Sequence, residues 1–485
     1  MFILFCTYFY SFEKETGVLN VSGAGDMDDY SLANYSPFMN HTEIKSVVIG
    51  SGITRIGEDA FYECTNLSDL TISDTVTNIG TEAFYKCGSL TSITIPGSVI
   101  RIGESAFDGT GYYNTDGNWE NNALYIGNVL IAGGRNGKYI IDNYVYSGEV
   151  EGVYAVKPGT RLIADWAFYQ CKKLTGITLP AGLKGMGSGV FWGCSSLTEA
   201  VIPEGVTSIP DNCFLNCTSL QSVTIPNGVT FIGYGAFKKC SALTGVLLPD
   251  SLTALDGFVF EGCIGISSMK IPQGVTVIPR GLFSGCTGLE TVDIGSAVTG
   301  IEDKAFEGCV QFRDITMPKS LTKIGTDAFK DCGTKIVIAR VFTIKGYKGS
   351  YAASYASKNK IRFVALDQPT PTEKPTPTAK PKSNSNSSGK NRKEVIKGKA
   401  PKVKIKGKSG KISVTYTALK KAAGFQVRYK NGAGKWITKT FKAKTSATKT
   451  IKKLKKGRYK VQVRSFTKGK KTYSKWSKAK TVNVR

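Results

Sequence analysis

A cysteine recurs every 23 residues along much of this chain, and this spacing constrains the fold more than any other feature. A phenylalanine stands three residues before each of these cysteines, so two columns of apolar side chains share one period. The cysteines of the column are Cys64, Cys87, Cys171, Cys194, Cys217, Cys240, Cys263, Cys286, Cys309 and Cys332. A fixed period of about 20 to 50 residues is typical of stacked supersecondary units and predicts a solenoid. Solenoids present long surfaces, which favours binding over catalysis.

A single repeat shows how each turn is built. Val223 and Ile225 are expected to point into the core from a short strand, because side chains alternate along a strand. Ser222 and Thr224 then point outward, and Pro226 ends the strand because it cannot donate to a ladder. The sequence therefore predicts a mainly β solenoid of 23-residue units with a parallel sheet on one face.

The cysteine column is interpreted as buried free thiols that act as small apolar residues. Equivalent side chains stack about 4.8 Å apart and point the same way, which disfavours disulfides. His41 and Thr110 occupy the same column at other turns, so the single histidine is interpreted as structural.

Composition and the extent of the 23-residue repeat divide the chain into four segments. Residues 1–16 are apolar, residues 17–366 form the solenoid with its caps, residues 367–400 form a Pro-, Thr-, Ser- and Lys-rich linker, and residues 401–485 form a small basic β-sandwich. The first segment has no basic residue before Lys14 and is a poor signal peptide, so a truncated signal and an intracellular start both stay open. No apolar run is long enough to cross a membrane as a helix.

The ends of the solenoid and one insertion interrupt the repeat. Residues 17–40 are expected to cap one end, and a helix over 349–358 with Ser350 as N-cap, followed by a strand over 361–366, should cap the other. The insertion, residues 111–148, is rich in aromatic residues. We expect it to form a hairpin of strands 123–132 and 138–146, with its aromatics either free to bind or packed on the solenoid.

Charge is distributed very unevenly in this chain of net charge +27. Residues 369–485 hold 36 Lys and Arg against 2 Asp and Glu, whereas the preceding residues hold 28 against 35. Such asymmetry favours an anionic partner for the tail. A solvated surface, an anionic wall polymer such as teichoic acid, and nucleic acid or host polyanions stay open, with nucleic acid least favoured. The densest basic cluster is Lys452, Lys453, Lys455, Lys456 and Arg458.

The outward strand positions are the best candidates for ligand contact, although Thr also simply suits exposed strands. They are Asp69, Thr71, Ser92, Thr94, Thr178, Glu199, Ser222, Thr224, Ser268, Lys270, Thr291, Asp293, Asp314 and Thr316. Aromatic residues dominate binding hot spots, and a second column follows the core phenylalanine. It comprises Tyr62, Tyr85, Tyr169 and Trp192.

Catalytic, metal and cofactor sites are not expected. General acid–base catalysis and nucleophilic triads commonly use histidine, and the one histidine lies in a structural column. Zinc sites need short paired spacings of Cys or His, and the one close pair, Cys213 and Cys217, is explained by two core columns.

The repeat resembles the BspA-like leucine-rich repeat proteins, whose unit reads L-x-x-I-x-I-P-x-x-V-x-x-I-G-x-x-A-F-x-x-C. The resemblance covers about residues 17–366, and Glu15–Gly23 and Ile344–Phe363 also look like the caps of that family. Residues 401–485 resemble a fibronectin type III module, with Tyr459–Arg464 as its strand F and Tyr473–Ser477 near strand G. The first resemblance implies a bacterial or protist surface protein associated with adhesion to host proteins and other cells.

These observations together favour a non-enzymatic, secreted or cell-surface binding protein. The solenoid is expected to contact a host or bacterial surface protein or glycan, and the basic module an anionic cell-wall polymer. The alternatives are an accessory glycan-binding protein of extracellular polysaccharide breakdown and an intracellular repeat scaffold.

Overall fold

A computed structural model describes most of the chain. The described residues are 8–31, 33–134, 139–141, 144–146, 150–334, 342–367, 403–408, 411–416, 424–431, 437–442, 447–451, 454, 456–466, 476–477 and 480–484. The chain divides into two compact units, Met1–Thr372 and Glu373–Arg485. Within the described ranges, no helix combines the length and the apolar character needed to cross a membrane.

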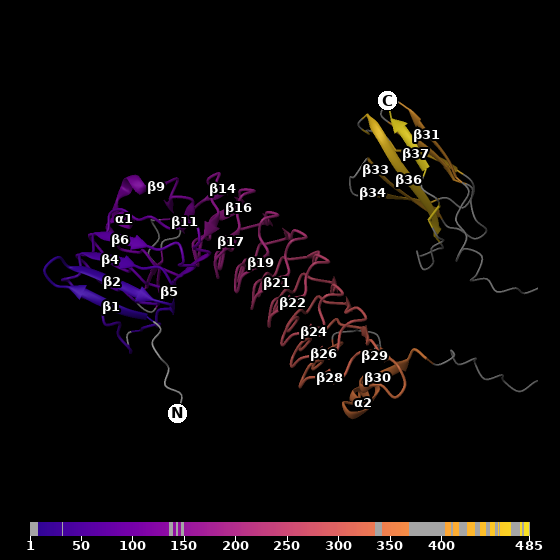
Figure 1. Ribbon diagram of the computed structural model, residues 1–485. Coiled ribbons are helices and arrows are strands. Elements are labelled where there is room, and N and C mark those ends of the chain that lie inside the picture. The colour runs from indigo at the N-terminus through magenta and orange to yellow at the C-terminus, as the bar shows by residue number, and fades with distance from the viewer. Residues whose placement is uncertain are drawn as a thin grey trace, which may run out of the picture. The chain divides into compact units, whose positions relative to one another are not determined.

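The first unit is a solenoid whose main strands stack in parallel, as predicted (Figure 1). Apolar residues at alternate positions face the core, as in β20, where Val223 is buried between exposed Ser222 and Thr224. The main strands are β2 (Val18–Gly23), β4 (Ser46–Ile49), β6 (Asp69–Ile72), β14 (Gly152–Ala155), β16 (Leu174–Thr178), β18 (Glu199–Val201), β20 (Ser222–Thr224), β23 (Ser268–Lys270), β25 (Thr291–Asp293), β27 (Asp314–Thr316), β29 (Thr343–Gly346) and β30 (Arg362–Ala365).

A second row of parallel strands, not predicted from the sequence, runs along the solenoid (Figure 1). Most are only two residues long, which is too short for the alternation that identifies a strand in a sequence. They are β3 (Gly25–Asp26), β5 (Ile53–Ile56), β7 (Asn78–Ile79), β8 (Arg101–Ile102), β15 (Leu162–Ile163), β17 (Gly185–Met186), β19 (Ser208–Ile209), β21 (Phe231–Ile232), β22 (Ala254–Leu255), β24 (Val277–Ile278), β26 (Gly300–Ile301) and β28 (Lys323–Ile324).

The loop segment of each turn forms a third hydrogen-bonded row. Asp59 N–H donates to Thr81 O (2.9 Å) and Glu63 N–H donates to Tyr85 O (2.8 Å), and the same bonds recur at later turns. Asp59 and Glu63 have φ of 53° and 56°, and equivalent residues of other turns are also left-handed. Left-handed backbone is unfavourable for most side chains, so these bonds help to hold each turn in this conformation.

The two predicted columns run through the core. The phenylalanine rings stack at centroid separations of 5.2 to 5.8 Å, and the described cysteines are free, as predicted. Each cysteine of the column that was named from the sequence donates its thiol to a backbone carbonyl of the preceding turn, as Cys240 does to Phe214 O at 3.1 Å. Burial raises the pKa of the Cys64 thiol to about 12.

The insertion differs from the single hairpin expected. The segment 123–132 is itself a hairpin of β10 (Ala123–Ile126) and β11 (Val129–Gly133), because Gly127 (φ 59°) and Asn128 form a tight turn. The other predicted strand divides in the same way into β12 (Tyr139–Ile141) and β13 (Tyr144–Tyr146). The proposed turn at 133–137 lies partly outside the described residues. Short elements α1 (Gly111–Asn114), η1 (Asp116–Asn118) and β9 (Trp119–Glu120) precede these hairpins.

Hairpin β10–β11 joins the second row of strands and divides the core. Strand β11 pairs in parallel with β15, so the hairpin continues the stack. Leu124, Ile126 and Val129 pack into the N-terminal core cluster. Ala123, Tyr125 and Leu130 pack into the C-terminal one. The hairpin therefore acts as a two-faced layer inside the solenoid.

Both ends of the solenoid are covered. At the C-terminal end, helix α2 (Tyr351–Lys358) and strand β30 follow the predicted pattern, and the Ser350 hydroxyl accepts a hydrogen bond from Ala353 N–H at 3.3 Å. At the N-terminal end, β1 (Tyr8–Glu13) pairs antiparallel with β2. The sheet therefore begins at Tyr8 and not at residue 17, and part of the predicted N-terminal segment belongs to it.

The second unit contains two antiparallel sheets, which fits the predicted sandwich. One sheet has the order β31 (Val403–Lys408), β32 (Lys411–Tyr416) and β35 (Ala447–Ile451). The other has the order β34 (Ile437–Lys442), β33 (Gly424–Asn431), β36 (Gly457–Phe466) and β37 (Lys480–Val484). Ile412 and Val414 of the first sheet share a buried cluster with Val427 and Val461 of the second.

Candidate binding surface

The outward positions of the main strands line up along one side of the solenoid. Of the fourteen predicted residues, all but Ser92 and Thr94 lie in strands, namely in β6, β16, β18, β20, β23, β25 and β27. All fourteen are exposed except Asp314, which is half-buried. The parallel register aligns Ser268 with Thr291 and Thr291 with Asp314, so side chains of successive turns stand next to one another.

The charges on this strand face are mixed. Lys345 forms an ion pair with Asp314 at 2.6 Å, and the register places Lys270 beside Asp293. Hydroxyl side chains such as Ser222 and Thr224 separate the charged positions. The face can therefore offer hydrogen bonds and paired charges to a polar ligand.

One of the breaks in the strand rows lies around residues 245–247 and is called the joint here. No backbone hydrogen bond connects residues 245–247 to β20 or β23, and β22 does not pair with β24. The loop row continues across this joint, since Phe260 N–H donates to Leu282 O at 3.0 Å. The Phe260 and Phe283 rings are 5.8 Å apart, the widest step measured in the column. The joint is therefore closed on the loop side and open on the strand side.

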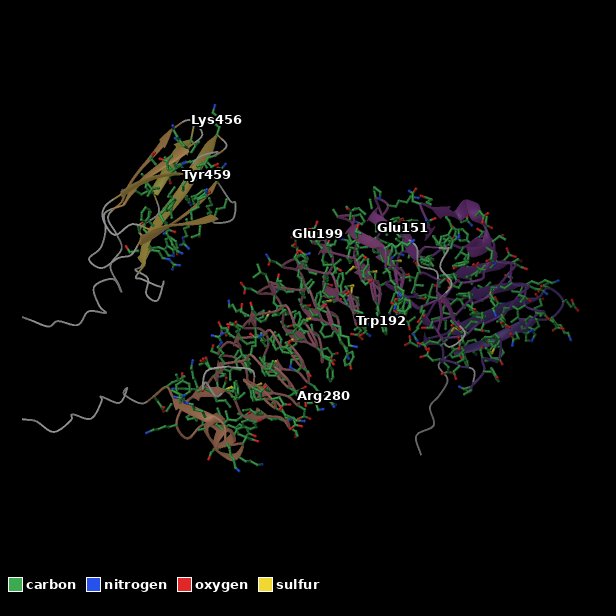
Figure 2. All side chains as sticks on the ribbon, turned by 180° about the vertical axis from the view of Figure 1, so that it is seen from behind. Glu151, Trp192, Glu199, Arg280, Lys456 and Tyr459 are labelled. Carbon is green, nitrogen blue, oxygen red and sulfur yellow. The ribbon has the colours of Figure 1, made fainter. Side chains whose placement is uncertain are left out.

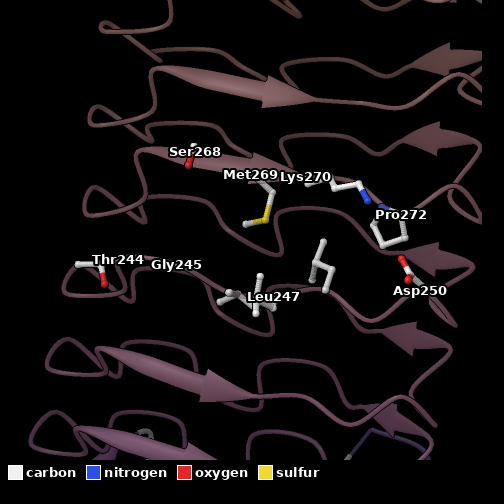
Figure 3. Close-up of a pocket in the computed structure, with 10 residues that line it drawn as sticks. Thr244, Gly245, Leu247, Asp250, Ser268, Met269, Lys270 and Pro272 are labelled. Atoms are coloured by element: carbon white, nitrogen blue, oxygen red, sulfur yellow. The ribbon is translucent and has the colours of Figure 1, made fainter. Parts of the chain in front are cut away.

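A groove of about 580 Å³ lies at this joint (Figure 3). Leu247, 84% exposed, lines it together with Met269, whose side chain extends toward the turn that carries Leu247. Asp250 and Lys270 provide opposite charges in the lining. The groove thus combines an apolar centre with polar groups, a composition typical of ligand sites, and sequence reasoning missed it because Gly245 and Leu247 only look like weaker versions of the repeat.

The predicted aromatic column lies on the loop segments and not in the main strands. Tyr62 and Tyr85 stack on each other at 5.0 Å, and burial raises the pKa of Tyr62 to about 12. Tyr169 is buried and packs edge-on against Trp192 at 5.6 Å. Trp166, which the sequence reasoning did not single out, completes this cluster 4.8 Å from Trp192.

The strand face and the aromatic column are two separate surfaces. Glu199 lies along one long edge of the solenoid, and Trp192 lies along the other (Figure 2). The sequence pattern could not separate them, because both columns share one period. A single compact ligand therefore cannot contact both sets.

Within residues 111–134 of the insertion, the aromatic side chains pack into the fold. Tyr112 donates its hydroxyl to Tyr125 O at 2.7 Å, and Trp119 donates its indole N–H to Tyr113 O at 2.8 Å. Tyr125 is buried and lies 3.1 Å from the Tyr154 hydroxyl, oxygen to oxygen. These residues support the structural alternative for the insertion.

Titratable groups do not converge on a recognisable catalytic arrangement in the described part of the chain. His41 packs edge-on against Phe12 at 5.4 Å, as a structural residue would. Burial raises the pKa of Glu82 to about 7, and the neighbouring carboxylates of Asp59, Glu104 and Asp108 add to this shift. Sequence reasoning missed this cluster, since its members belong to loop columns that are variable in other turns. The described residues include no group of three His, Cys, Asp or Glu arranged to hold a metal ion.

The predicted basic cluster lies only partly within the described residues. Lys456 and Arg458 are exposed, whereas Lys452, Lys453 and Lys455 lie outside the described ranges. Arg458 begins the outward series of β36, which continues with Lys460. The sequence analysis selected the densest run of basic residues and so missed this series, because strand residues that share a face are not consecutive.

Comparison with known proteins links the solenoid to one repeat family. A family model described as "BspA type Leucine rich repeat region (6 copies)" matches residues 32–131, 139–263 and 207–336. No curated protein matches the chain.

Several solved structures are also similar to this chain. A leucine-rich repeat protein from Bacteroides ovatus is 22% identical, with a TM-score of 0.35, covering 75% of this chain and 100% of that one. A leucine rich cell surface protein from Faecalibacterium prausnitzii is 24% identical, with a TM-score of 0.33, covering 76% and 99%. The pneumococcal vaccine antigen PcpA is 14% identical, with a TM-score of 0.29, covering 76% and 98%.

Proposed function

The chain belongs to the BspA-type leucine-rich repeat family, and from this premise we propose that it is a non-enzymatic binding protein of a cell surface or the extracellular space. The observation that carries the proposal is the strand face, where exposed side chains of successive turns stand in register. This face and the groove at Leu247 would contact a protein or glycan ligand. The similar Faecalibacterium protein is called a cell surface protein, which supports this location.

The second unit would serve as an attachment or spacing module. Its strand orders, β31-β32-β35 and β34-β33-β36-β37, support the expected fibronectin type III-like sandwich. Its lack of any Asp or Glu between residues 401 and 485 supports contact with an anionic surface.

The experiment is a binding assay of the full chain against immobilised mucin, host matrix proteins and isolated bacterial walls, with two double variants. Ser222→Arg with Thr224→Arg places bulky charges on the strand face, where both residues are exposed. Thr230→Arg with Thr253→Arg makes the same change beside the second row of strands and serves as the matched control. We expect the first pair to abolish binding to the host ligand and the control pair to retain it.

The outcomes separate the remaining functions. Retention of a polysaccharide alone would assign the protein to glycan capture. Equal binding by both double variants would show that the strand face is not the contact surface. Hydrolysis of any of these polymers by the purified chain would contradict a non-enzymatic role.

A further inference from the structure

The outward face of the four-stranded sheet in the second unit carries basic and neutral side chains only. Side chains alternate along β33 and β36, and Val427, Tyr429, Val461 and Val463 are buried against the other sheet. The basic residues at the alternate positions are Arg428, Lys430, Arg458, Lys460 and Arg464. Because residues 401–485 include no Asp or Glu, the net charge of this face is positive.

The strand register brings like charges together on this face. Lys430 of β33 pairs directly with Lys460 of β36, and like charges at directly opposite positions of an antiparallel pair are destabilising. Arg458 and Lys460 are two residues apart on one strand, which corresponds to about 6.8 Å. An anion with regularly repeated charges would relieve this repulsion at several positions at once.

The described aromatic residues around this face are already engaged or buried. The Trp476 ring contacts two guanidinium groups, with Arg428 Cζ 4.4 Å and Arg464 Cζ 4.5 Å from its centroid. Arg428 also donates to Gln462 Oε1 at 2.7 Å, which fixes the plane of its guanidinium group. Tyr429 and Tyr459 are 4% and 6% exposed.

This arrangement discriminates between classes of polyanion. Proteins that bind single-stranded nucleic acid combine a basic groove with aromatic faces on which the bases stack. The described residues of this unit provide the charges without an open aromatic face. A polymer of phosphates joined by short polyols has the repeated charge and no bases to stack.

We propose that the face formed by Arg428, Lys430, Arg458, Lys460 and Arg464 binds an anionic cell-wall polymer of the polyol-phosphate type. The proposal rests on the proposed function, in which this module contacts an anionic surface. It places the contact on the sheet face, and it assigns recognition to charge spacing and not to base stacking.

The test measures binding of the full chain to a synthetic poly(glycerol phosphate) chain of about ten repeats across a salt series, with oligothymidylate of equal charge as the comparison probe. The face variant is Arg458→Gln with Lys460→Gln. The control variant, Lys411→Gln with Lys439→Gln, removes the same charge from exposed positions off this face, since Lys439 pairs with Val427 and shares its side of the sheet. Circular dichroism checks that both variants fold.

We expect the face variant to bind about tenfold more weakly and to lower the salt slope by about 1.4, as for two lost phosphate contacts. The control variant should change affinity less than the face variant, and oligothymidylate should bind more weakly than the polyol phosphate. Equal losses in the two variants would overturn the assignment to this face, and tighter binding of oligothymidylate would overturn the ligand class. If the unaltered chain binds neither probe at low salt, the proposed function of the module itself fails.

Discussion

At the residue scale, the hydrogen bonds of the cysteine column show why cysteine suits this position and how the two residues that replace it differ. A cysteine suits this position because its thiol is small and apolar, and because it donates to the carbonyl of the preceding turn. Thr110 fills the same column, but its hydroxyl donates within its own turn, to Phe107 O three residues earlier at 2.8 Å. His41 stands in the first turn, where no preceding phenylalanine of the column presents a carbonyl.

The thiol's donor role predicts a difference between two variants of nearly equal shape. Cys240→Val removes the donor to Phe214 O, whereas Cys240→Thr keeps a hydroxyl that can donate to Phe214 O or, as Thr110 does, to the carbonyl three residues earlier. We expect the valine variant to be less stable than the threonine variant by about 1 kcal/mol, measured by urea unfolding. Equal free energies of unfolding would mean that the thiol is only an apolar filler.

The buried carboxyl of Glu82 predicts a pH dependence of stability. Its pKa in the folded state, about 7, is raised above the ordinary value of 4.5 by burial first and by neighbouring carboxylates second. The folded state therefore holds this proton more tightly, so the stability it contributes is present below about pH 4.5 and is lost as pH rises through 7. Glu82→Gln should stabilise the protein by about 1 to 3 kcal/mol at pH 8 and by little at pH 4.

Thermal unfolding at several pH values measures this effect. Glu204→Gln, at an exposed position, is the control and should leave the pH profile unchanged. A Glu82→Gln variant with the same pH profile as the unaltered protein would contradict the assignment.

At the element scale, hairpin β10–β11 is the least repetitive part of the solenoid and holds its two halves together. Successive side chains of the hairpin enter the two core clusters in alternation. Both of its faces are therefore buried, whereas a main strand buries only one face. Gly133, at its end, accepts the Cys171 thiol at 3.4 Å in the place of a column phenylalanine. A side chain is excluded there because the Phe168 ring occupies the space, 2.3 Å from where a Cβ would lie.

Gly133 therefore predicts a localised steric effect. Gly133→Ala should destabilise the protein by about 1 to 3 kcal/mol, because the Phe168 ring must shift within a packed core. Gly182→Ala is the matched control, since a Cβ there would meet nothing within 4 Å. Unfolding in urea checks both, and equal stability of the two variants would refute the close packing of Gly133 on Phe168.

At the scale of the whole molecule, the core of the solenoid is continuous from hairpin β10–β11 to the C-terminal cap, whereas its strand rows are not. The hydrogen-bonded strands fall into several separate sheets, and one of the breaks lies between the turns of β22 and β24. The loop row and the phenylalanine column cross this interruption. The strand side of the joint is therefore the side expected to open.

Amide hydrogen exchange tests this view of the joint. Amides of residues 245–247 have no backbone acceptor among the hydrogen bonds of this stretch, so they should exchange faster than those of Phe258, Phe260 and Gly262 in the loop row. Mass spectrometry of peptides covering the two segments measures the difference. Equal protection of both segments would show that the joint is closed in solution.

The sequence by itself determined the features that repeat. The period of 23 residues placed the main strands, the phenylalanine and cysteine columns and the exposure of positions such as Ser222 and Thr224, because one solution to packing is used at every turn. The capping helix was predictable as well, since its N-cap signal at Ser350 is local.

Only the tertiary structure decided the features that depend on contacts between turns. The left-handed positions of the loop row are occupied by Asp, Glu or Lys as well as by Gly. Residue type therefore does not identify these positions, whereas their hydrogen bonds to the next turn do. The same holds for the open joint at Leu247 and for the separation of Glu199 from Trp192. A repeat in one dimension specifies which residues are equivalent, but the three-dimensional path of the chain decides which of them meet.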